Sequence, residues 1–328
     1  MAGVILITGG AGYIGSRLIR DLASDPALSG CTIRIYDNLQ RETYATLLNL
    51  PQGHYQFIEG DILDNAGVRR ALQDVWAVVH MAAIVRTPLS FGPTGWIEQV
   101  NHWGTANLVD AAAAAGVEYF IYVSSASAYG PINTIGGQPF RETDISRPVG
   151  LYAESKLRGE QHVRAAHEHK RLRAVTLRLG TVFGLAPAVR FDAVANRFAY
   201  LASIHRPLTV YGDGKQVRPQ LHVSDASSAI RFALVHPVEM AGHVFNVVGE
   251  NVTILGLVEA LRALRSDVNV RYTEQDVLTH LSYAIDGSKL NALGWYPQVS
   301  TEAGLAELLD HMQGFMPFVP GEAVAVGE

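Results

Sequence analysis

Two side chains near the middle of the chain have the types and spacing of an acid–base pair. Tyr152 and Lys156 lie four residues apart, which on a helix places a phenol and an ammonium on one face, one turn apart. A free tyrosine has a pKa of about 10, and a nearby ammonium favours the phenolate and lowers that pKa. The pair could therefore act as a base toward an alcohol. The same spacing also occurs in exposed helical pairs, so its meaning depends on the surrounding motifs.

The composition narrows the class of protein. The 328 residues are 48% hydrophobic and 17% charged, with a net charge of −5, which disfavours a broad nucleic-acid surface. Cys31 is the only cysteine, which excludes internal disulfides and a cysteine-rich metal site, and we predict no metal. An apolar strand begins at Val4, and no apolar run reaches the about 18 residues of a membrane span. We therefore expect a cytoplasmic protein without nucleic-acid or membrane partners.

The N-terminal segment has the pattern of a dinucleotide cradle. Residues 4–7 read as a buried strand, residues 16–23 as an amphipathic helix, and Gly9, Gly12 and Gly15 fall between them. Glycines at this point allow a tight turn and let a pyrophosphate approach the backbone. The N-terminus of the helix then offers free N–H groups and a positive dipole to the phosphates.

Acidic residues follow the next two strands. Asp37 ends a strand at residues 32–36, where a carboxylate suits the ribose hydroxyls of NAD and repels the 2′-phosphate of NADP. Asp37 could instead cap a turn, and the nearby Arg41 keeps NADP open as an alternative. A third strand is expected at residues 57–62, where Asp61 is placed to face an adenine amine or to cap the following helix.

The remaining pattern alternates strands with helices. Further strands are expected at residues 75–81 and 119–124, with a helix of about five turns at 96–115. His80, at the end of one strand, is predicted to be a hydrogen-bonded structural histidine. This alternation predicts an α/β protein with a Rossmann-type doubly wound parallel sheet, whose ligands bind at the carboxyl ends of the strands.

Taken together, the ordered motifs resemble the extended short-chain dehydrogenase/reductases, the branch of nucleotide-sugar epimerases and dehydratases. The resemblance covers nearly the whole chain and rests on residues 8–15, 37–39, 60–62, 80–83 and 101–107, on Ser125, and on the Tyr152/Lys156 pair. It implies that Tyr152 is the catalytic base, that Ser125 hydrogen-bonds the reacting sugar oxygen, and that Lys156 lowers the tyrosine pKa and holds the nicotinamide ribose. Tyr129 matches an aromatic near the same site.

The resemblance also implies the ligands and their contacts. The expected cofactor is NAD, bound by Gly9, Gly12, Tyr13, Ile14, Gly15, Asp37, Asn38, Asp61, Ile62, Met81, Ala82, Ala83, Asn101, Ser124, Tyr152, Lys156 and Leu179. The expected substrate is a nucleoside-diphosphate sugar, bound by Ser125, Tyr152, Thr181, Arg218 and Tyr283. Arg218 matches an arginine that contacts the diphosphate, a role suited to its planar fork.

The second half of the chain resembles the substrate lobe of that family. We predict a cofactor domain at residues 1–180 with a returning segment near 222–248, and a smaller, interleaved substrate lobe mainly at 181–328. His222 and Asp225 are expected to organise the junction of the lobes. Thr181 replaces the family's usual asparagine, and the unusual residues 87–90 lie where substrate contacts are expected. A tail without a clear pattern follows residue 316.

These observations favour an NAD-dependent epimerase that acts at C4 of the sugar through a transient 4-keto intermediate. The dehydratases of the family carry Asp-Glu directly after the catalytic threonine, whereas the residues after Ser125 in this chain are Ala126 and Ser127, which cannot act as general acid and base. A nucleotide-sugar 4-ketoreductase that consumes NAD(P)H stays open, as does a non-catalytic dinucleotide-binding regulator. The resemblance further implies a homodimer through helices near 96–115 and 152–166.

Overall fold

A parallel sheet forms the centre of the molecule. The computed structural model describes residues 3–85, 94–131, 137–274 and 282–314. Within these residues, seven strands form one sheet, in the order β3-β2-β1-β4-β5-β6-β10. The strands are β1 (Gly3–Thr8), β2 (Cys31–Asp37), β3 (His54–Glu59), β4 (Val75–His80), β5 (Tyr119–Ser125), β6 (Arg173–Leu179) and β10 (Val244–Val247), and every pair is parallel. The order reverses between β1 and β4, which confirms the predicted doubly wound fold.

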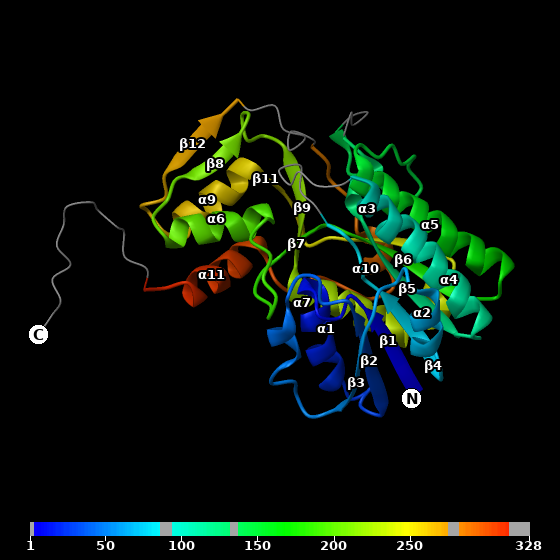
Figure 1. The fold of residues 1–328 in the computed structure, drawn as a ribbon. Helices are drawn as coiled ribbons and strands as arrows, with labels where there is room; N and C mark the ends of the chain where they lie inside the picture. The colour runs from blue at the N-terminus through cyan, green and yellow to red at the C-terminus, as the bar shows by residue number, and fades with distance from the viewer. Residues whose placement is uncertain (1–2, 86–93, 132–136, 275–281, 315–328) are drawn as a thin grey trace, which may run out of the picture.

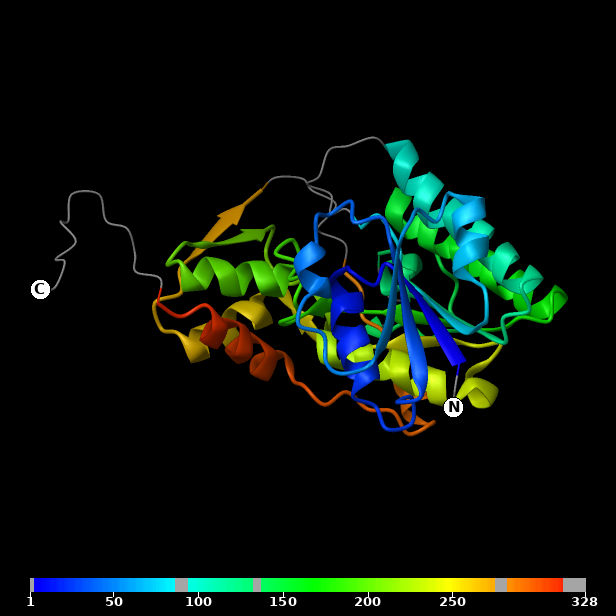
Figure 2. The same cartoon turned by 60° about the horizontal axis from the view of Figure 1, so that its bottom comes forward.

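Helices cover both faces of this sheet because the strands are apolar on both sides. Figures 1 and 2 show α1 (Tyr13–Ala23) and α7 (Val223–Val235) together on one face. The helices α2 (Asn65–Ala71), α4 (Thr105–Ala114) and α5 (Leu151–His169) lie on the other. Successive side chains of β1 point to opposite faces of the sheet: Ile5 and Ile7 pack on the side of α1 and α7, and Leu6 packs on the side of α2 and α4.

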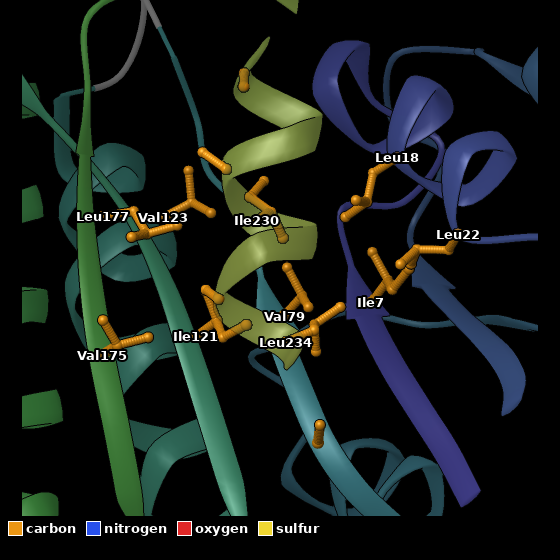
Figure 3. Close-up of a cluster of buried hydrophobic side chains, with 14 of the residues drawn as sticks. Ile7, Leu18, Leu22, Val79, Ile121, Val123, Val175, Leu177, Ile230 and Leu234 are labelled. Atoms are coloured by element: carbon orange, nitrogen blue, oxygen red, sulfur yellow. The ribbon is translucent and has the colours of Figure 1, made fainter. Parts of the chain in front are cut away.

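The core between the sheet and α7 fixes the strand ends. Figure 3 shows side chains of adjacent strands directed at this helix and at α1: Ile7, Val79, Ile121, Val123, Val175 and Leu177 from the strands, with Leu18, Leu22, Ile230 and Leu234 from the helices. All are buried, and full burial of one such side chain contributes about 1.5–3 kcal/mol. The carboxyl ends of the strands are therefore held on a rigid base.

A second group of elements lies beside the sheet (Figure 1). Within the described residues it contains a three-stranded sheet of β7 (Thr181–Phe183), β9 (Val217–His222) and β11 (Glu250–Thr253), and a two-stranded sheet of β8 (Leu208–Tyr211) and β12 (Val270–Thr273). Its helices are α6 (Val194–Ser203), α9 (Ile254–Leu264) and α11 (Thr301–His311). Between β9 and β11 the chain returns through α7, α8 (Pro237–Met240) and β10 to the large sheet. The domain boundary at residues 180 and 181 stays a prediction.

Short helices join these elements. They are η1 (Tyr44–Leu47) after β2, η3 (Ala126–Tyr129) after β5, and α10 (Ser288–Asn291) before α11.

The predicted helix at residues 96–115 has a different form. It consists of α3 (Thr94–Glu98), a π-helical turn η2 (Gln99–Gly104) and then α4. The wider turn coincides with Asn101, whose side chain bonds the backbone of Ile84. A π turn of this kind follows from tertiary contacts, which the helical periodicity of the sequence does not contain.

The third strand also begins and ends earlier than predicted, at His54–Glu59, so that Asp61 follows it. The predicted substrate segment at residues 87–90 and the tail after residue 316 lie outside the described residues.

Candidate active site

The carboxyl ends of the strands open into a pocket of about 850 Å³ that extends from the glycine turn to the second lobe. Every residue predicted from the sequence to bind cofactor or substrate, or to act in catalysis, lines this pocket, with the exception of Asn101. Residues from distant parts of the chain, such as Gly9, Tyr152 and Arg218, therefore share one cavity. Their individual contacts with ligands stay predictions.

The glycine turn is shaped by close approach of backbone to backbone. Gly9 has φ +72°, and a Cβ there would lie 2.7 Å from the backbone nitrogen of Ala82. A Cβ at Gly15 would lie 2.6 Å from Cα of Gly10. Gly12 is the N-cap of α1 and has no side chain to cover the first N–H groups of the helix. The sequence folds this way locally because only glycine fits, and the result is an open helix N-terminus at the pocket.

Two carboxylates lie at the ends of β2 and β3. Asp37 accepts hydrogen bonds from the backbone N–H of Ala11 (3.0 Å) and Leu39 (2.9 Å). Burial raises the pKa of Asp37, and these two bonds oppose the shift. Asp61 accepts from Asn38 Nδ2 (2.9 Å) and from the N–H of Leu63 (2.9 Å). Asp61 therefore closes a turn, whereas the cap of the following helix α2, the alternative predicted for Asp61, is Asp64. Each carboxylate keeps lone pairs for a ligand.

The predicted catalytic side chains meet where β5 ends and α5 begins. Gly150, with φ +90°, precedes the helix, and Tyr152 and Lys156 face the pocket from its first turns. The Ser125 hydroxyl lies near the Tyr152 phenol and lowers its pKa. Ser125 also accepts from Ser127 Oγ at 2.9 Å. A phenol, a hydroxyl and an amine thus converge on one region of the cavity, as an acid–base site for an alcohol requires.

The opposite end of the pocket belongs to the second lobe. Thr181 lies on β7 and Arg218 on β9, and the Arg218 guanidinium lies 5.4 Å from the centre of the Tyr283 ring. Burial lowers the pKa of Arg218, although the group stays protonated at any physiological pH. A planar cation in a buried pocket suits a diphosphate.

A model of the "NAD dependent epimerase/dehydratase family" matches residues 5–248. The chain belongs to this family. Members of the family are NAD-dependent enzymes that act on nucleotide sugars.

Relatives of this chain are named for different activities. The low-salt glycan biosynthesis protein Agl12 of Haloferax volcanii is 31% identical over 94% of this chain and 98% of its own length. A mouse dTDP-D-glucose 4,6-dehydratase is also 31% identical, over 93% of this chain and 87% of its own length. The crystal structure of Bacillus cereus UDP-glucuronic acid 4-epimerase with UDP-glucuronic acid and NAD superposes with a TM-score of 0.85 at 27% identity, covering 94% and 98% of the two chains. Family membership alone therefore leaves the reaction open.

The pocket fits NAD, the cofactor of this family. The missing β-carbons of the glycine turn leave space for a pyrophosphate at the N-terminus of α1. Asp37 at the end of β2 suits the adenosine ribose, because a carboxylate can accept a hydrogen bond from the 2′-hydroxyl. Arg41 lies near this carboxylate but donates to the carbonyl of Val85 (3.2 Å). Lys156 and Tyr152 would then lie at the nicotinamide end.

The electrostatics of the catalytic pair differ from the prediction. Burial raises the pKa of Tyr152, and the group of opposite charge that lowers it is Arg190, followed by the Ser125 hydroxyl. Lys156 was predicted to supply that charge. Its side chain is buried, and the loss of solvation lowers the pKa of its ammonium to about 7.

Arg190 is a site residue that the sequence reasoning missed. Its guanidinium forms a two-point pair with Asp192 (2.9 and 2.7 Å), and both residues line the pocket. Its carbonyl accepts from Asn196, which also binds the N–H of Gly184 (2.8 Å). The hydroxyl of Tyr13 donates to the carbonyl of Gly184 (2.6 Å) and so joins the glycine turn to the second lobe. No motif precedes Arg190 in the sequence, so only the folded chain reveals it.

Asn101 and His80 are structural in this arrangement. Asn101 bonds both backbone groups of Ile84 (2.7 and 3.0 Å) and Ser155 Oγ (3.1 Å), which holds the segment after β4 against α5. His80 lies between the hydroxyls of Thr8 (2.7 Å) and Thr105 (2.9 Å). Burial lowers the pKa of His80 to about 3, so the ring is neutral. The prediction of a hydrogen-bonded structural histidine is confirmed.

Tyr129 was expected near the reacting sugar, but it lies behind the pocket. Its ring stacks on Phe140 with centroids 4.9 Å apart, and its hydroxyl donates to Asn246 Oδ1 (2.8 Å). The 3₁₀ turn η3 rotates this side chain away from Ser125 and buries it. Tyr129 therefore supports the site without lining it.

His222 and Asp225 connect α7 to the C-terminal segment, in agreement with the expected junction role. His222 forms a hydrogen bond with Glu307 (2.9 Å), and Asp225 accepts from the backbone of Gln298 and Val299.

No three histidine, cysteine or acidic side chains in the described part of the chain are grouped so that they could hold a metal ion. None of the helices described here combines the length and apolar character needed to cross a bilayer.

Proposed function

We propose that the protein is an NAD-dependent epimerase of a nucleoside-diphosphate sugar that inverts C4 through a transient 4-keto sugar. When bound, NAD supplies the hydride acceptor and donor that such an intermediate requires. Tyr152 takes the proton of the C4 hydroxyl and later returns it. Ser125 hydrogen-bonds the same sugar oxygen, and Arg218 holds the diphosphate.

The acidic and basic side chains that line the pocket support this proposal. Removing water across C5 and C6 needs a base for the carbon-bound proton and an acid for the leaving hydroxyl. Among the described residues that line the pocket, the carboxylates are Asp37, Asp61 and Asp192. The first two follow strands at the adenosine end, and Asp192 is paired with Arg190. At the sugar end, positions 126 and 127 are alanine and serine. Epimerisation needs only the groups that are present.

The charge near Tyr152 bears on the choice of substrate. The charge of Arg190, which is paired with Asp192, lowers the pKa of Tyr152, so in this proposal a guanidinium lies near the reacting part of the sugar. This charge suits a sugar that carries a carboxylate. UDP-glucuronic acid, the ligand of the Bacillus cereus relative, is therefore the first substrate to test.

The test is a panel of nucleotide sugars incubated with the purified protein and analysed by NMR and mass spectrometry. The panel contains UDP-glucuronic acid, UDP-glucose, UDP-N-acetylglucosamine and dTDP-glucose. The proposal expects a C4 epimer of unchanged mass. A product lighter by one water would identify a dehydratase and overturn the proposal. Stoichiometric consumption of added NADH or NADPH on a keto substrate would identify a ketoreductase instead.

We also propose that the protein forms a homodimer in which α4 and α5 of two copies pack together. These helices lie side by side on the outer face of the sheet (Figures 1 and 2). Light scattering at micromolar concentration should give twice the chain mass of 35.6 kDa. A monomeric mass would contradict this part of the proposal.

A further inference from the structure

Lys156 lies in surroundings that disfavour its charge. Only 3% of the residue is exposed, and its ammonium lies 4.5 Å from the centre of the Tyr122 ring on β5. An aromatic face attracts a cation, but a buried ammonium also needs an anion or it loses its proton. Glu160 follows Lys156 by one helical turn on α5, and its negative charge opposes the effect of burial by raising the pKa of Lys156.

Glu160 is itself buried and firmly held. Its carboxylate accepts from Ser124 Oγ at 2.5 Å. Arg178 on β6 donates to it from Nε (2.9 and 3.2 Å) and from Nη2 (2.6 Å). The side chains of Glu160 and Arg178 are 7% and 6% exposed. A two-point bond to a guanidinium fixes the position of a carboxylate.

The other polar groups around Lys156 cannot replace this carboxylate. Tyr122 on β5 and Tyr152 on α5 are neutral phenols at neutral pH because burial raises the pKa of each. His80 on β4 is neutral because burial lowers its pKa. Arg178 on β6 carries the same sign as the ammonium and lies behind Glu160. Among these groups, Glu160 is the anion.

We propose that Glu160 is a positioning residue whose buried carboxylate holds Lys156 in the ammonium form that acts beside Tyr152. The use of that ammonium in catalysis rests on the proposed function, but its charge is a property of the protein alone. The two parts can therefore be tested separately. The role reaches the reaction only through Lys156, since Glu160 does not line the pocket.

The first test measures the titration of Lys156 directly. The full-length protein is labelled competitively with acetic anhydride between pH 5 and 10, and peptide mass spectrometry gives the extent of reaction at Lys156. The pocket gives the reagent access to this amine. Glu160→Gln should lower the pKa of Lys156 by about 1–2 units, because it removes an opposite charge at close range. Glu154→Gln is the control: this half-exposed carboxylate on the same helix pairs with Arg158 (3.9 Å), so its loss should leave the pKa of Lys156 unchanged.

A second variant provides the same test if Glu160→Gln unfolds the protein. Glu160→Gln leaves the Arg178 charge buried without its partner, which is destabilising. The double variant Glu160→Gln/Arg178→Met removes both charges and retains the side-chain volumes. It should be folded by circular dichroism and lower the Lys156 pKa by a smaller amount, about one unit, because a repulsive charge is lost as well.

The outcomes distinguish this inference from the proposed function. If Lys156 titrates in the folded variants as it does in the wild type, Glu160 does not hold its charge and the inference is wrong. If the titration shifts but the wild type epimerises no nucleotide sugar, the proposed function fails while the electrostatic role stands. In an active wild type, Glu160→Gln should also move the basic limb of the kcat/KM profile to lower pH, which a purely structural residue would not do.

Discussion

Replacement of Lys156 by methionine should make the fold more stable while it removes activity. Burial lowers the pKa of this ammonium from 10.5 to about 7. At about 1.4 kcal/mol per unit, holding the charged form in the folded state below pH 7 costs roughly 4–5 kcal/mol. Methionine is apolar and of similar length, so it avoids this cost and still packs on the Tyr122 ring. We expect a net gain of about 2–4 kcal/mol near neutral pH.

The pH dependence gives this prediction a specific signature. The unfolded chain keeps the Lys156 proton up to about pH 10.5, whereas the folded chain releases it near pH 7. Wild-type stability should therefore rise as the pH increases from about 7 toward 10.5. The advantage of Lys156→Met is then largest at pH 7 and below, and it disappears toward pH 10.5.

Urea unfolding at pH 6, 7.5 and 9 measures this difference, and a thermal scan at pH 7 should show a rise of about 3–6 °C for a chain of this length. Lys170→Met is the control. Lys170 ends the same helix, is 45% exposed and pairs with Asp110 at 2.6 Å, so its loss should change the stability by less than about 1 kcal/mol at every pH. The reasoning would be refuted if Lys156→Met were less stable than the wild type at pH 7, or if their difference did not change with pH.

Three other substitutions test single contacts. Gly9→Ala places a Cβ 2.7 Å from the backbone nitrogen of Ala82, at a φ of +72°. It should weaken NAD binding at least about tenfold in a fluorescence titration, and equal affinity would show that this turn does not hold the pyrophosphate. Arg190→Gln removes the charge that lowers the Tyr152 pKa, so the acid limb of the kcat profile should move up by about one pH unit; an unmoved limb would exclude this role. Gly159→Ala introduces a Cβ that overlaps the buried Tyr122 hydroxyl and should cost about 1–3 kcal/mol in denaturant unfolding; unchanged stability would mean that the ring can shift freely.

The parts of the site that the sequence predicted depend on local geometry. The spacing of Gly9, Gly12 and Gly15 between a strand and a helix sets the shape of one turn, and each residue acts within that turn. The same holds for Tyr152 and Lys156, which share a helix face. Because the fold class follows from the alternation of strands and helices, the pocket at the strand ends could be anticipated as well.

The parts that the sequence did not predict depend on tertiary packing. Arg190 reaches the pocket through bonds of its own segment to Asn196 and Asp192, and no periodicity marks that segment. Asn101 matched a family motif, but the π turn directs its amide to the backbone of Ile84. The low pKa of Lys156 arises from burial, which spacing alone cannot reveal.

The most direct test of the account follows the hydrogen on C4. A nucleotide sugar from the panel, deuterated at C4, is incubated with the wild type in ordinary water, and both sugars are then examined by NMR and mass spectrometry. The account predicts that the deuterium stays on C4 of both epimers, that the mass is unchanged, and that Tyr152→Phe forms at least about 100-fold less product. Loss of water with solvent hydrogen at C5 or C6, or full activity without the Tyr152 hydroxyl, would contradict it.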